Sequence, residues 1–246
     1  MNDVLQPLVD LPGVRDAADR ARDALAEVHR HKANRRGWPT TAAEAAVRAA
    51  RSSAAIDGGR TELPEPGTVG DPILTGALRV GQALDGEALQ NLVGVWQRAP
   101  LQALARLHLL AAADLVADSE QLGRPRAGDD VAARLDLLAQ TVLTSNAPAP
   151  VIAAVVHGEL LALRPFGAGD GVVARGASRL VAVSSGLDPH SLGVPEVFWL
   201  RRRQAYLDAA AAFGAGTAEG VGGWVLFCCG AFEDGAREAR SIADAA

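Results

Sequence analysis

Residues 150–175 read PVIAAVVHGELLALRPFGAGDGVVAR, and this stretch decides the fold of the chain. Its first part is almost wholly apolar up to Leu163, with His157 and Glu159 as the conspicuous polar side chains, which predicts a buried central helix. Three glycines follow at the start of a second apolar segment. Because glycines before a helix let backbone N–H groups approach a ligand, this spacing is typical of an anion-binding loop. The stretch therefore predicts two packed helices joined by a loop with the backbone of an anion site.

The rest of the chain repeats apolar residues at spacings of three and four, which predicts helices and no clear strand. Residues 58–72 are rich in proline and glycine and should form a loop. The expected helices cover 14–31, Thr40 or Thr41 to Gly58, 73–84, 85–97, 100–122, 131–145 with Asp129 or Asp130 as the N-cap, 150–163, 171–187, 195–213, and a last helix from 219 or 221 that frays into a polar end. The sequence thus predicts an all-α fold, with residues 1–39 as an N-terminal helical extension and residues 40–246 as the main domain.

The amino-acid composition limits the classes of protein to which this chain can belong. The chain has 246 residues, 49% of them hydrophobic, but no apolar run reaches the roughly 18 residues that a membrane helix needs. Its start, MNDVLQPLVD, is unlike a signal peptide, so we expect a cytoplasmic protein without a membrane partner. The net charge of −5 argues against nucleic acid as a partner. The two adjacent cysteines, Cys228 and Cys229, are expected to pack in the core rather than hold a metal.

The order of an apolar helix, the loop and a second apolar helix resembles the Fic (Fido) family, whose motif is HPFx(D/E)GNGRxxR. The resemblance covers roughly residues 40–235 and implies a Fic-like helical bundle. In this resemblance some positions keep the residue of the family motif, namely Pro165, Phe166, Gly169, Gly171 and Arg175. At the other positions the residue differs: Arg164 stands in place of the catalytic histidine, Ala168 of the acidic metal ligand, Asp170 of the asparagine and Val172 of the first arginine.

A second stretch agrees with this resemblance. Residues 53–58, SAAIDG, resemble the inhibitory motif (S/T)xxxE(G/N) of the same family, with Ser53 and Gly58 at its ends and Asp57 in place of the glutamate. In that family the inhibitory carboxylate pairs with the second arginine of the main motif, so the resemblance implies a pair between Asp57 and Arg175. The family's target-docking flap should lie within residues 123–148, which show no alternating strand pattern. We therefore expect the flap to be reduced or absent.

Fic enzymes transfer a phosphate-containing group, most often AMP from ATP, to a side-chain hydroxyl group. Arg164 cannot act as the general base, because a guanidinium group stays protonated at neutral pH and has no site to accept a proton. His157 precedes it by two helical turns and is expected to be a core histidine. Ala168 offers no ligand to Mg²⁺. Asp170 is expected to N-cap the second helix, and Arg164 to pair with Glu159 or Asp170.

The repulsion expected at the loop is large enough to decide between functions. Placing a carboxylate such as that of Asp170 about 4 Å from one phosphate charge costs roughly 4 kcal/mol of repulsion at an effective dielectric constant of 20. A helix N-terminus returns about 0.3–1 kcal/mol, and up to ~2 kcal/mol when partly buried. Ordinary ATP turnover is therefore not expected from this loop.

Three functions stay open from the sequence. The first is a catalytically degenerate Fic-fold protein, or pseudoenzyme, that binds a protein partner or an anionic, nucleotide-like ligand through Gly169, Asp170, Gly171 and Arg175. The second is an active transferase that uses ATP and Mg²⁺ with Asp170 as a new metal ligand. The third is a structural or regulatory helical protein whose glycine loop is only a tight connection. No dedicated metal motif and no other cofactor motif is present, and a homo-oligomer stays open.

Overall fold

The structure is a computed structural model that describes residues 3–63, 65 and 70–246. Within these residues every regular element is a helix, which confirms the predicted all-α class. The elements are α1 (Gln6–Val9), α2 (Val14–Arg30), α3 (Asn34–Ile56), α4 (Pro72–Ala83), α5 (Gly86–Trp96), α6 (Pro100–Ala112), η1 (Ser119–Gln121), α7 (Asp129–Thr144), α8 (Ala149–Leu163), α9 (Asp170–Ser184), α10 (Pro195–Arg201), α11 (Arg203–Gly214) and α12 (Ala218–Ala245). Part of the loop predicted for 58–72 lies outside the described residues.

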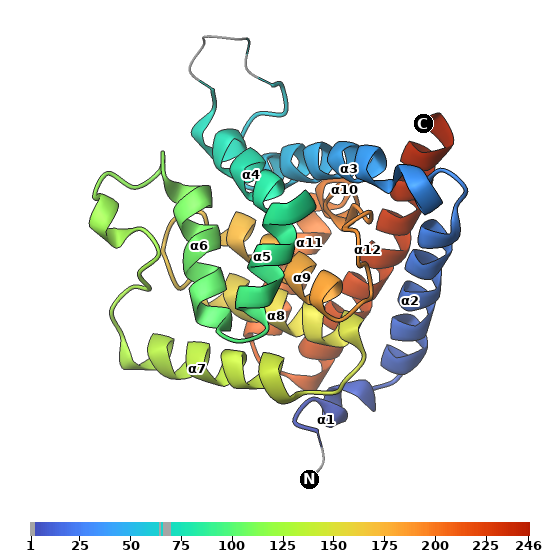
Figure 1. Cartoon of the computed structure of the whole chain (residues 1–246). Coiled ribbons are helices and arrows are strands. Elements are labelled where there is room, and N and C mark those ends of the chain that lie inside the picture. The colour runs from blue at the N-terminus through green and yellow to red at the C-terminus, as the bar shows by residue number, and fades with distance from the viewer. Residues whose placement is uncertain (1–2, 64, 66–69) are drawn as a thin grey trace.

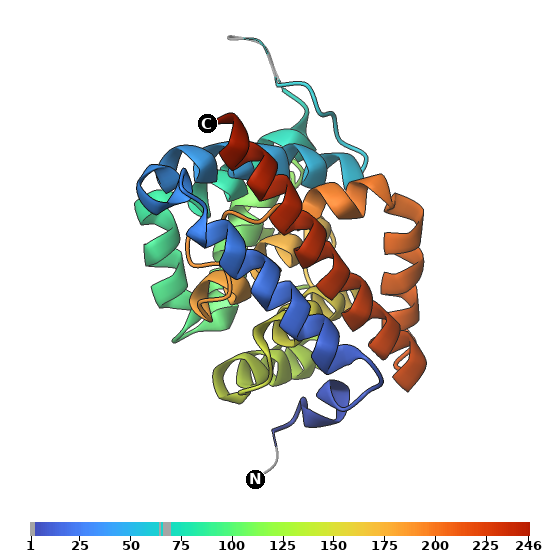
Figure 2. The same ribbon diagram turned by 90° about the vertical axis from the view of Figure 1, so that its right-hand side faces the viewer.

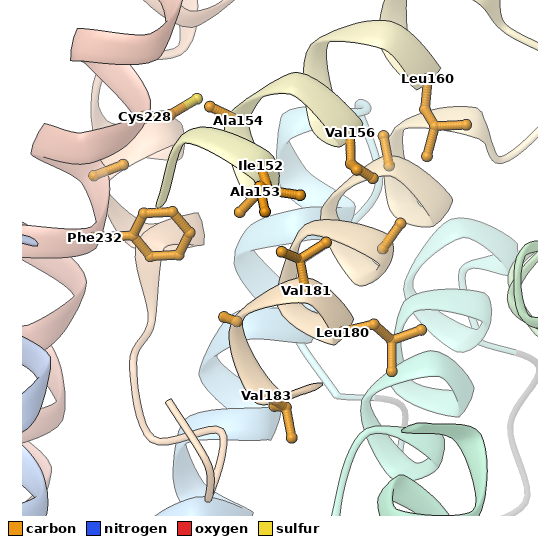
Figure 3. Close-up of a cluster of buried hydrophobic side chains, with 14 of the residues drawn as sticks. Ile152, Ala153, Ala154, Val156, Leu160, Leu180, Val181, Val183, Cys228 and Phe232 are labelled. Atoms are coloured by element: carbon orange, nitrogen blue, oxygen red, sulfur yellow. The ribbon is translucent and has the colours of Figure 1, made fainter. Parts of the chain in front are cut away.

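Helices α8 and α9 form the centre of the molecule, as the apolar stretch predicts (Figure 1). Ten of the fifteen residues of α8 are buried and lie all around the helix, which is typical of a helix enclosed by others. Figure 3 shows side chains of α8, among them Ile152 and Ala153, facing Val181 of α9 and, on another side, Phe232 of α12. Cys228 and Cys229 are buried in the same core, which confirms their predicted packing. No helix in the described part of the chain is long and apolar enough to cross a membrane.

Helix α12 lies side by side with α2 along the outside of the bundle (Figures 1 and 2). It begins at Thr217, whose side chain accepts a hydrogen bond from the N–H group of Gly220. The predicted fraying of its C-terminal end is wrong, because the helix continues to Ala245. Small apolar residues there, among them Ala236 and Ala239, are buried and hold this part of the helix against the bundle.

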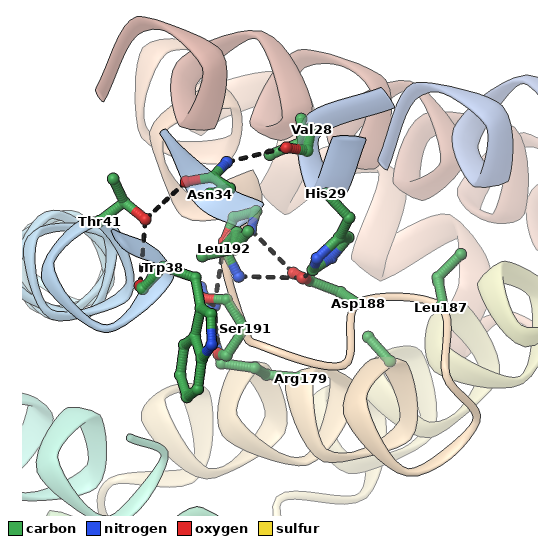
Figure 4. Close-up of polar contacts among 12 residues, drawn as sticks. Val28, His29, Asn34, Trp38, Thr41, Arg179, Leu187, Asp188, Ser191 and Leu192 are labelled. Carbon is green, nitrogen blue, oxygen red and sulfur yellow. Dashed lines mark hydrogen bonds and ion pairs between the residues drawn. The ribbon is translucent and has the colours of Figure 1, made fainter. Parts of the chain in front are cut away.

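The N-terminal helices are tied to the loop between α9 and α10 by buried polar contacts (Figure 4). Asp188 in that loop accepts hydrogen bonds from the N–H groups of Leu192 and Gly193, and its Oδ1 lies 2.8 Å from Nε2 of His29. Trp38 stacks on His190 with 4.1 Å between ring centroids. These contacts therefore join α2 and α3 to the rest of the helical bundle at the loop between α9 and α10.

Helix α3 begins at Asn34 rather than at Thr40 or Thr41. The Asn34 side chain donates to the carbonyl oxygen of Val28 and accepts from the Thr41 hydroxyl group, which fixes the turn before Pro39. Pro39 removes one backbone hydrogen bond near the start of the helix without ending it. The domain boundary predicted between residues 39 and 40 thus falls inside α3, and the division into an extension and a main domain stays a prediction.

Three other boundaries differ from those predicted. The helix expected over 100–122 ends at Ala112, after which Asp118 caps η1 by accepting from the N–H group of Glu120. The helix expected over 195–213 is broken at Arg202, where φ is −118° and ψ is 38°, into α10 and α11. Helix α7 has Gly128 as its N-cap, so Asp129 and Asp130 are its first two residues. It is helical where the resemblance implies a flap, and the described residues of that region contain no strand.

Candidate functional site

A cleft of about 510 Å³ lies at the N-terminus of α9. Its lining comes from the end of α3, the start of α4, the turn after α6, the end of α8, the glycine loop and α11. This volume is in the range of ordinary small-molecule sites, about 300–1,000 Å³. The lining residues are Ile56, Asp57, Ile73, Leu115, Leu161, Arg164, Gly167, Ala168, Gly169, Asp170, Gly171, Val172, Arg203 and Leu207.

The glycine loop is held open by its backbone conformation. Helix α8 ends at Arg164 in the left-handed region, with φ 46° and ψ 60°. Gly167 and Gly169 follow with φ values of 81° and 67°, which favour glycine because they crowd a Cβ atom. Gly169 is the N-cap residue of α9. The spacing of glycines read in the sequence therefore corresponds to two required left-handed positions.

Two side chains from neighbouring segments support this loop. Arg126 donates its backbone N–H group to Pro165 O at 2.7 Å and its guanidinium group to the carbonyl oxygens of Leu163 and Arg164 at 3.0 and 3.2 Å. His108 of α6 stacks on Phe166 with 4.2 Å between ring centroids. Burial lowers the pKa of His108, which the Ala168 backbone only partly opposes. His108 is 1% exposed and does not line the cleft, so it offers no general base there.

Asp170 does not cap α9, which corrects the prediction. It is the first residue of the helix, and its Oδ1 accepts from the N–H group of Phe166 at 2.9 Å, so the carboxylate bonds back to the loop. Its Oδ2 is buried without a hydrogen-bond partner. Burial raises the pKa of Asp170, while the N–H groups of Phe166 and Gly167 act in the opposite direction. Among the described residues, no side chain caps the N–H groups at the start of α9.

We expect Asp170→Asn to be more stable than the wild type at pH 7. A carboxyl group whose pKa is raised by folding opposes the folded state once it ionises, and the amide Oδ1 keeps the bond to the loop. Because the carboxyl group becomes protonated in both the folded and the unfolded state at low pH, the stability advantage of Asp170→Asn should shrink as pH falls toward the unfolded-state pKa of about 3.9. Urea unfolding between pH 4 and 8 measures it, with Asp208→Asn on the exposed side of α11 as the control. An advantage that grows toward low pH would contradict this reasoning.

The predicted pair of Asp57 and Arg175 is present, although the two residues are 118 positions apart. Arg175 NH2 lies 2.7 Å from Asp57 Oδ2. The same guanidinium group donates to Ser53 Oγ at 2.8 Å, to Ser53 O at 3.0 Å and to the Tyr206 hydroxyl group at 3.2 Å. Burial acts to lower the pKa of Arg175, but Asp57 and Tyr206 raise it above its usual value. The arginine is therefore charged and almost fully engaged within the chain.

Asp57 also lies directly against the N-terminus of α9. A Cβ atom added at Gly171 would stand 2.6 Å from Asp57 Oδ1 and in still closer conflict with Oδ2. Only glycine at this position lets the carboxylate come so near the helix end, where the helix dipole favours a negative charge. Gly58, with φ 90°, then turns the chain away toward solvent. The place where the loop would receive an anion thus holds a carboxylate of the protein itself.

His157 is a core histidine, as predicted. It is fully buried among Trp199, Tyr206 and Trp224, and its Nε2 lies 2.8 Å from the Tyr206 hydroxyl oxygen. Because the Tyr206 oxygen accepts from Arg175, its own proton is free for His157. Burial lowers the pKa of His157 far below its usual range and, together with the Arg175 charge, keeps the ring neutral. Tyr206, which the sequence reasoning missed, joins the buried core to the Asp57–Arg175 pair.

The four positions predicted to be replaced all line the cleft, where Arg164 is exposed, Ala168 and Val172 are apolar and Asp170 is buried. Arg164 is exposed, and no hydrogen bond or ion pair of its guanidinium group is present among the described residues. Arg164 was predicted to pair with Glu159 or Asp170. Glu159 pairs instead with Arg134 at 2.7 Å, whereas the Arg164 charge acts on Asp170 and opposes the rise of its pKa without an ion pair between them among the described residues. Ala168, which the resemblance places at an acidic metal ligand, offers only a methyl group. Within the described residues, no three His, Cys, Asp or Glu side chains are grouped so that they could hold a metal ion.

The architecture is similar to that of two solved Fic structures. A Fic family protein from Desulfovibrio desulfuricans G20 superposes with a TM-score of 0.70 and 18% identity, over 94% of this chain and 74% of that chain. Fic-1 from C. elegans, residues 134–508, superposes with a TM-score of 0.73 and 16% identity, over 97% of this chain and 75% of that chain. No family sequence model and no curated protein sequence matches the chain. The likeness is therefore one of architecture, and the chain has the Fic fold.

Proposed function

We propose that this chain is a catalytically degenerate Fic-fold protein, which binds an anionic ligand in its vestigial cleft and does not transfer a nucleotide. The observation that carries the proposal is the position of Asp57. Its carboxylate, bonded to Arg175, covers Gly171 at the helix end where a phosphate would have to sit. A phosphate there would have to displace the carboxylate from Gly171, and about 4 Å from a carboxylate it would meet a repulsion of up to roughly 4 kcal/mol, which the Arg175 charge reduces.

The residues around the loop do not fit ATP with Mg²⁺. Ala168 has no oxygen ligand for the metal, and Mg²⁺ in nucleotide sites relies on one or two carboxylates beside the phosphates. Arg164 cannot take a proton from a hydroxyl group at neutral pH. Arg175 already makes four hydrogen bonds inside the chain, so it would have to give up partners to hold a phosphate. Base, metal ligand and phosphate arginine are thus all unsuited to the reaction.

The alternative is a transferase that uses Asp170 as its metal ligand. One observation favours it, since Oδ2 of Asp170 has no partner and the residue lines the cleft. Against it stand the burial of that oxygen and the raised pKa of the carboxyl group, which disfavour the ionised form that a metal needs. The degenerate binder is therefore the better-supported function.

The test is an incubation of the purified full chain with labelled ATP and Mg²⁺ or Mn²⁺, alone and with a cell lysate, together with isothermal titration of Mg–ATP. We expect no labelled protein, and no binding tighter than millimolar. Asp57→Gly is the matched variant, because it clears the helix end without touching the loop, and we expect it to remain without transfer activity. Labelling by either protein that Arg175→Ala abolishes would establish the transferase instead.

A further inference from the structure

The cleft carries two exposed cationic side chains, Arg164 and Arg203, that form no ion pair among the described residues. Arg203 uses its Nε to donate to Ile56 O at 2.8 Å, and no partner of its terminal nitrogens is present among the described residues. Arg164 makes no side-chain hydrogen bond or ion pair there. Asp57, on the same lining, is matched by Arg175 behind it. Asp170, also on the lining, is buried with its pKa raised by that burial, and the Arg164 charge partly opposes the rise. The exposed charged groups on the lining that form no ion pair among the described residues are therefore the cations Arg164 and Arg203.

The same cleft has an aliphatic wall. Ile73, Leu115 and Leu161 line it half-buried, and Leu207 lines it with 40% of its surface exposed. A single exposed leucine on a protein surface needs no explanation. Here, however, four aliphatic side chains from α4, the turn after α6, α8 and α11 converge on one concave surface. Apolar walls with a few placed polar groups are typical of small-molecule sites.

We propose that the cleft binds a small organic monoanion with an apolar body, whose carboxylate or sulfonate is held by Arg164 and Arg203 while its body packs on Ile73, Leu115, Leu161 and Leu207. This assignment rests on the proposed function, because it requires that Asp57 keep the helix end closed to a nucleotide. Planar guanidinium groups suit such a head, since they present paired N–H donors to a planar or tetrahedral anion. The terminal nitrogens of both arginines are free to do so.

Charge and volume together fix the orientation and the size of the ligand. Asp57 lies at the helix end and would repel an anionic head placed there, so the head belongs with the two arginines. A polyphosphate needs the same helix end and is excluded for the same reason. A peptide added as a strand finds no strand edge within the described residues. A cleft of about 510 Å³ encloses a ligand of drug-like size rather than a folded partner.

The experiment uses 1-anilinonaphthalene-8-sulfonate as the fluorescent probe on the folded full chain, with decanoate and decanol as unlabelled competitors. We expect saturable binding that decanoate displaces and decanol displaces far less. Arg164→Gln combined with Arg203→Gln should weaken binding at least roughly tenfold, because each arginine contributes a charge-assisted hydrogen bond. Leu207→Asp should weaken it similarly. Arg106→Gln and Leu137→Asp, which are exposed and lie outside the cleft, are the matched controls and should leave it unchanged.

The outcomes separate this inference from the proposed function. Binding that the cleft variants leave unchanged, or that decanol and decanoate displace equally, would overturn the ligand class while leaving the degenerate function intact. The absence of probe binding by folded protein would do the same. Displacement of the probe by micromolar Mg–ATP would overturn the proposed function first, and the ligand class with it. Near-ultraviolet circular dichroism on every variant confirms that the probe reports a folded cleft.

Discussion

Arg175→Ala should lower the free energy of unfolding by about 3 kcal/mol or more, since removing one partner of a buried charge pair costs about 3–5 kcal/mol. The Arg175 side chain is 1% exposed, whereas Asp57 is 27% exposed and keeps some contact with water, which favours the lower end of that range. The substitution also leaves Ser53 O and the Tyr206 hydroxyl group without their donor. Urea unfolding at pH 7 measures the change.

Two further variants identify the cause of this loss. Arg106→Ala replaces an exposed arginine and should stay within about 0.5 kcal/mol of the wild type. Arg175→Met keeps most of the apolar stem, so it should recover packing but not the hydrogen bonds to Ser53, Asp57 and Tyr206. A methionine variant as stable as the wild type would show that the side chain acts through packing alone. The network would then not be what fixes α3 on α9.

The effect of Gly171→Ala on the free energy of unfolding should change sign between the wild type and the Asp57→Ala variant. In the wild type the new methyl group would collide with the Asp57 carboxylate, with 2.8 Å left to its carbon atom, so we expect a loss of about 1–3 kcal/mol. When Asp57 is already alanine, the three nearest atoms to the new methyl group are gone, and the same change adds a good helix former to α9. There we expect a gain of about 0.5–1 kcal/mol.

The four proteins of this cycle are compared by urea unfolding, which gives the coupling between the two positions. Gly223→Ala in α12 is the control, because nothing lies within 4 Å of the added Cβ atom. It should have the same effect with and without Asp57. A Gly171→Ala effect of equal sign and size in both backgrounds would mean that the carboxylate does not rest on the helix end.

The sequence predicts the centre of the fold well, because local pattern and burial agree there. The apolar residues up to Leu163 leave α8 mostly buried, with ten of its fifteen residues inside the bundle, and Gly167 and Gly169 are needed where φ is positive. The contact between Asp57 and Arg175 followed from two motifs read together, since neither residue alone marks a partner 118 positions away. These features depend on residue type at a fixed spacing, which a sequence displays directly.

Other features depend on contacts that no local pattern records. Asp170 was expected to cap α9, but Gly169 in the left-handed region takes the cap position and turns the carboxylate back to Phe166. Helix α3 starts early because Asn34 reaches Val28 of the preceding helix. The arginine that joins Arg164 at the cleft, Arg203, comes from a run of three arginines with no distinguishing signal. Each of these depends on the backbone conformation of the folded chain rather than on residue type at a fixed spacing.

We infer that the Asp57 carboxylate occupies the anion position of the glycine loop. This can be tested by a crystal structure of the full chain soaked with ATP and Mg²⁺. We expect Asp57 to remain bonded to Arg175 and in contact with Gly171, with no phosphate at the N-terminus of α9. Density for a phosphate group on the N–H groups of residues 169–171, with Asp57 displaced and Arg175 turned to the ligand, would contradict it.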